Sequence, residues 1–197
     1  SEDGAAHLVA GAIDAYGRLD VLVNNAGAPH GQDCGQIEDV PLSAWEAVMA
    51  INVRGVFLMT RAAVPHMKKR GYGRVVSMAS VAGLEALPER AAYCASKAAV
   101  IGMTRSLAYD LAPHGVTANC VCPGSIRTDR AISSTLRAGW TDVDEGLAER
   151  AKFIPVGRHG RPEEIAATIA HLASEDAAYI TGQAIAVDGG GLPASAF

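Results

Sequence analysis

The stretch "AAYCASKAAVIGMTRSLAYDLAPHGVTANCVCPG", residues 91–124, decides the fold. Residues 91–115 have the spacing of an amphipathic helix, and residues 116–124 form a short apolar run that ends in Pro-Gly, as a buried strand would. The same alternation recurs along the chain, with further strands expected at 19–27, 73–80 and 182–190 and further helices expected at 4–16, from 42 onward and from 161 onward. Such alternation is typical of βαβ units around a parallel sheet that is covered on both faces. The sequence therefore predicts an α/β fold.

The composition is that of a soluble globular protein with one domain, since 49% of the 197 residues are hydrophobic and 19% are charged. The formal net charge is −4 and no basic stripe is present, which argues against a nucleic-acid partner. No apolar run approaches the roughly 18 residues that span a bilayer, and the start, "SEDGAAHLVAG", lacks the pattern of a signal peptide. We therefore expect a cytoplasmic protein with no membrane partner.

Cysteine spacing bears on two further kinds of site. The four cysteines, which could in principle form two disulfides or a metal site, are Cys34, Cys94, Cys120 and Cys122. No C-x-x-C pair and no His-rich spacing accompanies them. We expect them to be reduced, buried, small apolar residues, and we expect no metal site.

Two side chains in residues 91–115 suggest chemistry. Tyr93 and Lys97 lie one helical turn apart, so their side chains are separated by about 40° around the axis and share one face. An ammonium group beside a phenol brings proton transfer within reach at neutral pH; for the pair alone, a solvated tyrosine beside a lysine is the alternative. Two neighbours favour catalysis. Ser80 ends the strand at 73–80, where ligands bind in open α/β sheets, and Asn52 interrupts an otherwise apolar helix.

Further motifs occur in a fixed order along the chain: "NNAG" at 24–27, "YCASK" at 93–97, "CPGSIRT" at 122–128 and "YITGQAIAVDGG" at 179–190. Together with Asn52 and Ser80, they resemble the classical short-chain dehydrogenase/reductase family, of the kind related to 3-oxoacyl carrier-protein reductases. The resemblance covers nearly the whole chain. A lone Y-x-x-x-K is common by chance, whereas ordered elements at compatible spacings are specific.

The resemblance implies a Rossmann-like, doubly wound parallel sheet and an NAD(P)-dependent oxidoreductase that interconverts a ketone and a secondary alcohol. Tyr93 would be the general acid in reduction and the base in oxidation, and Lys97 would activate it and bind the nicotinamide ribose. Ser80 would orient the substrate carbonyl, and Asn52 would hold a water that connects Lys97 to a proton relay. The residues implied to contact NAD or NADP are Asn24, Ala26, Gly27, Tyr93, Lys97, Pro123, Gly124, Ile126 and Thr128.

Several of these residues also have simpler explanations when they are judged singly. Ser80 could end a strand, Asn24 could form a turn, and Thr128 could cap a helix. The identity of a small carbonyl or alcohol substrate would be set by residues 81–90 and by the long connection 125–160, which we expect to be a substrate flap.

One element of the family is not found in the 197 residues, namely the glycine-rich turn T-G-x-x-x-G-x-G that binds the cofactor pyrophosphate. By the family pattern we expect a single, N-terminally incomplete domain, 1–197, in which the first three strands are missing. The strand at 19–27 would then be an exposed apolar edge. The alternative to an active enzyme is therefore a catalytically silent fragment or an oligomerisation module. The resemblance further implies a homo-oligomer, either a dimer or a tetramer.

Overall fold

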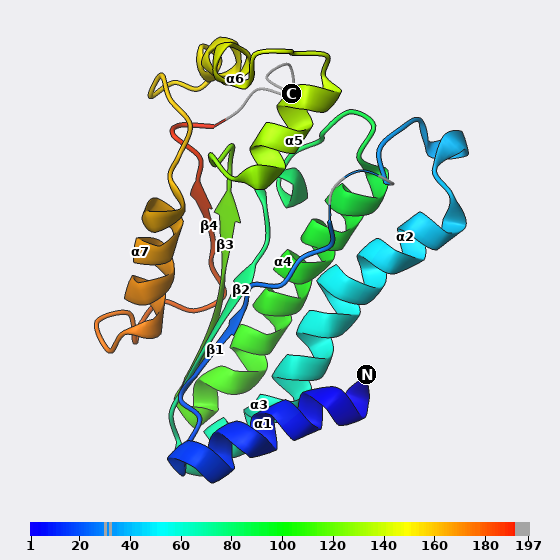
Figure 1. The fold of residues 1–197 in the computed structure, drawn as a ribbon. Coiled ribbons are helices and arrows are strands. Elements are labelled where there is room, and N and C mark those ends of the chain that lie inside the picture. Colours follow the sequence, from blue (N-terminus) through cyan, green and yellow to red (C-terminus); the bar gives the residue numbers. More distant parts are fainter. Residues whose placement is uncertain (30, 32, 192–197) are drawn as a thin grey trace.

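A sheet of four parallel strands forms the centre of the protein (Figure 1). The structure is a computed structural model that describes residues 1–29, 31 and 33–191. The strands, in their order across the sheet, are β1 (Val21–Asn24), β2 (Gly73–Met78), β3 (Val116–Pro123) and β4 (Ala184–Val187). In the register of the sheet, Val76 lies opposite Val23 of β1 and Asn119 of β3. The predicted α/β fold is confirmed, and each predicted strand is present in a shortened form.

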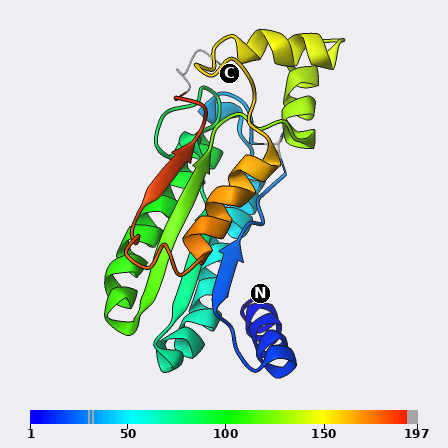
Figure 2. The same cartoon turned by 90° about the vertical axis from the view of Figure 1, so that its left-hand side faces the viewer.

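Helices cover both faces of the sheet (Figure 2). The four helices that do so are α1 (Glu2–Tyr16), α3 (Val56–Arg70), α4 (Ala91–Leu111) and α7 (Pro162–Ala173). Successive strand residues point to opposite faces. Val75 accordingly packs with Met67 of α3 in one core cluster, whereas Val76 packs with Leu172 of α7 in another. This arrangement explains why the strands are apolar without alternation.

After a loop, the chain between β1 and β2 forms one long helix with an irregular centre. It consists of α2 (Leu42–Met49), a π-helical segment η2 (Ala50–Gly55) and α3. Ser43 and Glu46 have the spacing of a capping box, but α2 begins after Pro41 and no side chain caps it. By length and composition the 29-residue helix Leu42–Arg70 could cross a membrane, which the sequence analysis did not anticipate. Only 28% of its most apolar 18 residues are buried, although Met67 packs against the sheet.

β1 lies at the edge of the sheet, as the family pattern predicts. Leu22 and Asn24 point inward, while Val21 and Val23 are 36% and 40% exposed. The apolar side chains of this strand are therefore only half covered by the described residues.

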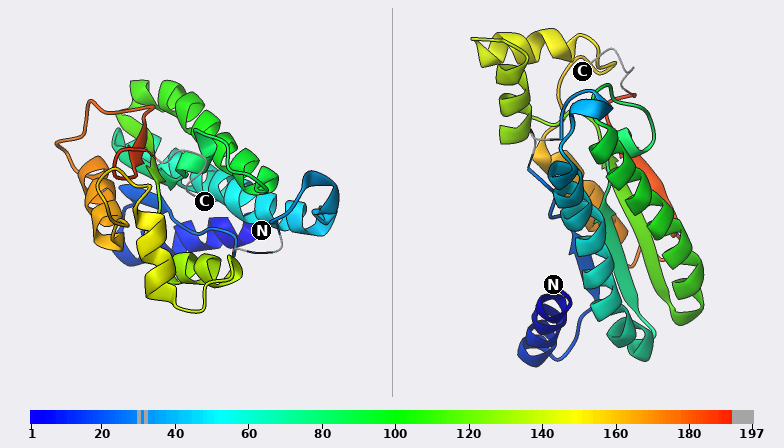
Figure 3. Two further views of the ribbon diagram at one scale, coloured as in Figure 1. Left: turned by 90° about the horizontal axis from the view of Figure 1, so that it is seen from above. Right: turned by 90° about the vertical axis from the view of Figure 1, so that its right-hand side faces the viewer.

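The connection 125–160 contains two helices that the sequence analysis did not predict, α5 (Asp129–Arg137) and α6 (Val143–Ala151). Asp142 caps α6 by accepting hydrogen bonds from two backbone N–H groups. Gly146 fits tightly against α5, because a Cβ there would lie 2.5 Å from Thr135 Cγ2. Figure 3 shows both helices beyond the end of the sheet toward which the strands point.

The 3-10 turns are η1 (Ile37–Asp39), η3 (Val81–Gly83) and η4 (Ala112–His114).

The cysteines differ from the expectation that all four are buried. Cys120 and Cys122 are fully buried on β3 and pack with Val100 of α4. Cys94 is half-buried and Cys34 is exposed, since neither belongs to a strand of the core. Within the described part of the chain, no three His, Cys, Asp or Glu side chains are grouped in a way that could hold a metal ion.

Candidate active site

The candidate site lies at the carboxyl edge of the sheet, where parallel strands place the ends of their loops. Three loops meet there: the one after β1, the one after β2 and the one after β3 (Figure 1). The N-terminal turns of α4 bring Tyr93 and Lys97 to the same edge. The structure therefore gathers the main residues that the sequence analysis selected.

Lys97 and Tyr93 do lie side by side. Lys97 Nζ lies 5.8 Å from the centre of the Tyr93 ring and donates a 2.8 Å hydrogen bond to the carbonyl oxygen of Met78. Only 5% of Lys97 is exposed. Burial, and after it the nearby charge of Arg130, lowers the pKa of Lys97 to about 8. The last residue of β2 thus holds the amine beside the Tyr93 ring, where burial makes its charged form less stable than that of an exposed lysine.

Ser80 lies just beyond the end of β2, where its side chain accepts a 3.2 Å hydrogen bond from the N–H of Ala82. This bond caps the short turn η3. Ser80 therefore has a structural role at the end of the strand segment. The turn itself rests on α4. A Cβ on Gly83 would lie 2.7 Å from the carbonyl carbon of Lys97, so only glycine permits this approach. Gly83 thereby allows η3, the turn that Ser80 caps, to pack directly on the backbone of Lys97, a contact that sequence spacing did not predict.

Asn52 finds the partners that a buried polar side chain in an apolar helix requires. Its Oδ1 accepts a 2.7 Å hydrogen bond from the N–H of Ala28, and its Nδ2 donates a 2.9 Å bond to Ser96 Oγ. Ser96 in turn donates to the carbonyl oxygen of Tyr93 at 2.7 Å. The π-helical segment carries Asn52, as such segments often do at functional sites. Asn52 therefore connects the loop after β1 to the turn of α4 that bears Tyr93.

Two arginines flank the Tyr93 ring. The guanidinium carbons of Arg90 and Arg130 lie 4.8 Å and 4.6 Å from the ring centre. Arg90 also forms a 3.1 Å ion pair with Asp33, while Arg130 donates a 3.3 Å hydrogen bond to the carbonyl oxygen of Ala28. Neither arginine was predicted from the sequence, because Arg130 is distant from Tyr93 along the chain and neither belongs to a recognised motif.

The side chains expected to contact a cofactor are divided between the interior and the surface. Asn24 is buried and donates hydrogen bonds of 3.2 Å to Thr60 and Ser77, so its amide ties β1 to α3 and β2. The next residues of the turn, including Ala26 and Gly27, are exposed. The backbone of the "NNAG" turn is thus open at the sheet edge, while its first side chain is structural.

The segment from Pro123 to Thr128 runs along the same edge. Gly124 donates a 3.1 Å hydrogen bond to Val187, and a Cβ on Gly124 would lie 2.7 Å from Asp188 Cβ. Ile126 pairs with Gly160, and Thr128 stands at the start of α5 without capping it through its side chain. Backbone pairing therefore fixes this segment beside the ends of β3 and β4.

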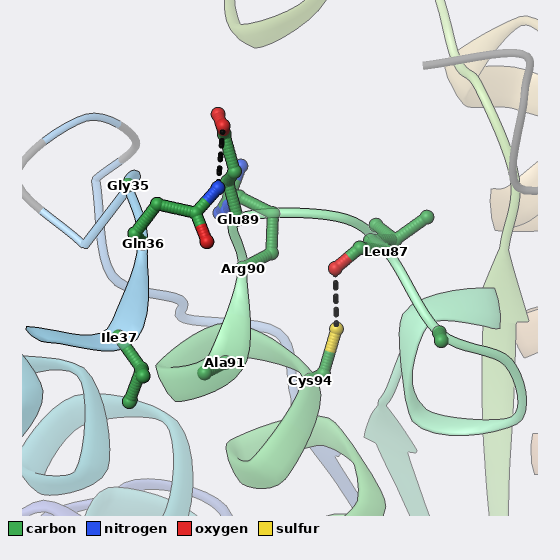
Figure 4. Close-up of a pocket in the computed structure, with 9 residues that line it drawn as sticks. Gly35, Gln36, Ile37, Leu87, Glu89, Arg90, Ala91 and Cys94 are labelled. Atoms are coloured by element: carbon green, nitrogen blue, oxygen red, sulfur yellow. Dashed lines mark hydrogen bonds between the residues drawn. The ribbon is translucent and has the colours of Figure 1, made fainter.

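A cavity of about 350 Å³ borders the site (Figure 4). It is lined by residues 35–37, 86–87, 89–91 and 94. A 3.2 Å hydrogen bond from Gln36 to Glu89 crosses its rim, and Cys94 faces the carbonyl oxygen of Leu87. Arg90 lines the cavity and also contacts the Tyr93 ring, so the two features are adjacent.

Comparison with known proteins decides the family. The profile of the family described as "Enoyl-(Acyl carrier protein) reductase" matches residues 1–191. The chain belongs to the short-chain dehydrogenase/reductase family. A 3-oxoacyl-[acyl-carrier-protein] reductase of Synechocystis sp. (strain ATCC 27184 / PCC 6803 / Kazusa) is 43% identical over 189 residues, which cover 95% of this chain and 71% of that protein.

Solved structures give the same result. The crystal structure of levodione reductase matches with a TM-score of 0.91 at 31% identity, covering 96% of this chain and 72% of that one. A structure described as ElxO with NADP bound matches with a TM-score of 0.87 at 28% identity, covering 96% of this chain and 73% of that one. This short-chain dehydrogenase/reductase is therefore an oxidoreductase of a class that acts on CH–OH or carbonyl groups and uses NAD(P).

Proposed function

We propose that this chain interconverts a ketone and a secondary alcohol on a small molecule, with Tyr93 as the general acid and base. The observation that carries the proposal is the buried amine of Lys97, which lies 5.8 Å from the centre of the Tyr93 ring at the carboxyl edge of the sheet. A positioned proton donor of this kind contributes about 100- to 10,000-fold to a rate.

In the direction of reduction, the Tyr93 hydroxyl donates its proton to the carbonyl oxygen of the substrate. The positive charge of Lys97 stabilises the phenolate that remains. Ser80 orients the carbonyl by a hydrogen bond from its hydroxyl. Lys97 then gives a proton to the phenolate, and a relay through a water held by Asn52 returns a proton from solvent to Lys97. Oxidation reverses these proton movements.

NAD or NADP, when bound, supplies or accepts the hydride. Lys97 and the segment that contains Pro123, Gly124, Ile126 and Thr128 would hold its nicotinamide end, and the exposed turn after Asn24, with Ala26 and Gly27, would lie under the cofactor. This assignment is supported by the open backbone of the first turn and by the pairing that fixes the second at the sheet edge.

Replacing Tyr93 by phenylalanine tests the proposal. Tyr93→Phe removes the proton donor but keeps the ring and its contacts with the two arginines. We expect kcat to fall by at least about 100-fold with little change in melting temperature. Tyr109→Phe is the matched control, since Tyr109 lies on the same helix and is 88% exposed. Unchanged turnover in Tyr93→Phe would remove the assignment.

A second candidate function is a catalytically silent module for assembly. It is favoured by the half-exposed edge strand β1. It is also favoured by the apolar helix Leu42–Arg70, because only 28% of its most apolar 18 residues are buried. Titration of the 197-residue chain with NADH and NADPH, followed by nucleotide fluorescence, separates the two functions. Binding supports the enzyme. The silent module is supported if the chain binds neither nucleotide and binding is restored when a strand and a glycine-rich turn are joined upstream of Ser1.

A further inference from the structure

Three positive charges surround the Tyr93 ring. The charged groups of Arg90, Lys97 and Arg130 lie 4.8, 5.8 and 4.6 Å from its centre. Each comes from a different part of the fold: Arg90 from the start of α4, Lys97 from its second turn and Arg130 from α5. A tyrosine ring attracts a cation through its face, but one ring does not neutralise three charges.

The negative charges near the ring compensate only part of this excess. Asp33, whose side chain is 2% exposed, pairs with Arg90, whose side chain is 12% exposed. Lys97 is held by a neutral carbonyl group, and Arg130 is held by the carbonyl oxygen of Ala28 and the ring. Among the ion pairs of the described residues, none joins Arg130 to a carboxylate. The site therefore carries an excess of positive charge.

Lys97 and Arg130 lie close enough for their charges to interact. After burial, the charge of Arg130 is the next cause that lowers the pKa of Lys97, so the two cations repel each other. An anion placed between them would relieve that repulsion. Sites that hold a cluster of one sign in a partly desolvated setting attract ligands of the opposite sign.

We propose that the substrate carries a carboxylate near its carbonyl, and that Arg130 binds this group. The proposal rests on the proposed function, because it assumes that the carbonyl is reduced at Tyr93. Arg130 is suited to the role because a guanidinium can bind a carboxylate or phosphate through two parallel hydrogen bonds. Its hydrogen bond to Ala28 is long at 3.3 Å and is easily exchanged for a stronger one.

Arg90 is less suited to this role, because Asp33 already neutralises it. Its guanidinium borders the cavity of about 350 Å³ and contacts the ring from there. We therefore assign Arg90 the task of positioning Tyr93 and the loop that carries Asp33. Arg130 alone is assigned to specificity.

The first experiment compares charged and neutral carbonyl compounds. Pyruvate, acetoacetate and levulinate are each assayed against the corresponding methyl ester, and the ratio of the two kcat/KM values is the readout. We expect the wild type to prefer the best acid over its ester by about 10- to 100-fold, and Arg130→Gln to lose that preference. Lys152→Gln is the control, since it removes the same charge from an exposed position on the same connection. A ratio near one in the wild type, or an unchanged ratio in Arg130→Gln, would overturn the proposal.

The second experiment does not depend on turnover. The chain and Arg130→Gln are titrated with the same three oxo acids and their esters by calorimetry. Binding of an acid but not its ester, lost in Arg130→Gln and kept in Lys152→Gln, supports the anion site even if Tyr93 proves inactive. If no acid binds the wild type, the proposal is wrong.

A third measurement distinguishes the two sources of an anion, the substrate and the cofactor diphosphate. We expect the Kd for NADPH, measured by nucleotide fluorescence, to be the same in Arg130→Gln and the wild type. A weaker NADPH affinity combined with an unchanged ratio of acid to ester would place the diphosphate on Arg130, and the proposal would fail.

Discussion

Lys97 is a site residue whose pKa the fold shifts strongly, through burial of its amine. The residue is only 5% exposed, in an environment that also holds Arg130, so its charged form is disfavoured. The hydrogen bond to Met78 and the ring of Tyr93 compensate only part of that cost. The fold therefore gives up stability at neutral pH in order to place an amine beside a phenol.

This cost predicts how stability depends on pH. The pKa of Lys97 is lowered by burial from 10.5, the ordinary value that a lysine keeps in an unfolded chain, to about 8 in the folded protein. Between these values the unfolded chain binds the proton that the folded protein has released, so stability rises with pH. The full effect is about 3 kcal/mol. We expect the free energy of unfolding of the wild type to rise by about this amount relative to Lys97→Met between pH 8 and 10.5.

Urea unfolding at a series of pH values measures the difference. Subtracting the curve of Lys97→Met removes the titration of all other groups. Lys152→Met, which removes an exposed lysine, should run parallel to the wild type. Parallel curves for Lys97→Met and the wild type would mean that the amine is not perturbed by burial.

At the scale of elements, the contact between η3 and α4 determines the geometry of the site. Gly83 lies so close to the backbone of Lys97 that a Cβ would be 2.7 Å from its carbonyl carbon. Because the obstacle is backbone, it cannot move aside as a side chain would. We expect Gly83→Ala to push η3 away from α4, displace Ser80, lower kcat and destabilise the protein by about 1–3 kcal/mol.

Gly102→Ala is the matched control on the same helix, since a Cβ there would meet nothing within 4 Å. Alanine is the better helix former, so this variant should be more stable than the wild type by up to about 1 kcal/mol. Unfolding and initial-rate measurements on both variants test the contact. If Gly83→Ala behaves like Gly102→Ala, the turn does not rest on the helix as described.

The elements also show which features a sequence can predict. The strands were predictable because burial on both faces requires continuous apolar runs, and the Tyr93–Lys97 pair because helical spacing is local. The partners of Asn52 and the approach of Arg130 to Tyr93 depend on contacts between segments far apart in the chain, which spacing does not encode. The helices α5 and α6 were missed because each is only 9 residues long and largely polar. In the same way, the capping pattern at Ser43 competed with Pro41, which set the start of α2.

At the scale of the whole molecule, the long helix between β1 and β2 presents apolar side chains to solvent. Ile51 is 39% exposed and Phe57 is 48% exposed. Only 28% of the most apolar 18 residues of Leu42–Arg70 are buried. Exposed apolar surface of this kind commonly marks a protein interface. The family resemblance implies a dimer or a tetramer, and this helix offers the apolar surface for one.

We therefore expect the purified chain to form a dimer or tetramer through this surface and Phe57→Glu to lower its mass. A carboxylate at the centre of an apolar interface would be desolvated without a partner, which costs more than the lost ring contacts alone. Multi-angle light scattering coupled to size-exclusion chromatography, over a range of concentrations, measures the mass. Tyr179→Glu is the control, because Tyr179 is fully exposed in the loop before β4 and the same charge there should leave the assembly intact. A wild-type chain that stays monomeric throughout, or a Phe57→Glu variant of unchanged oligomeric mass, would show that this helix does not form the interface.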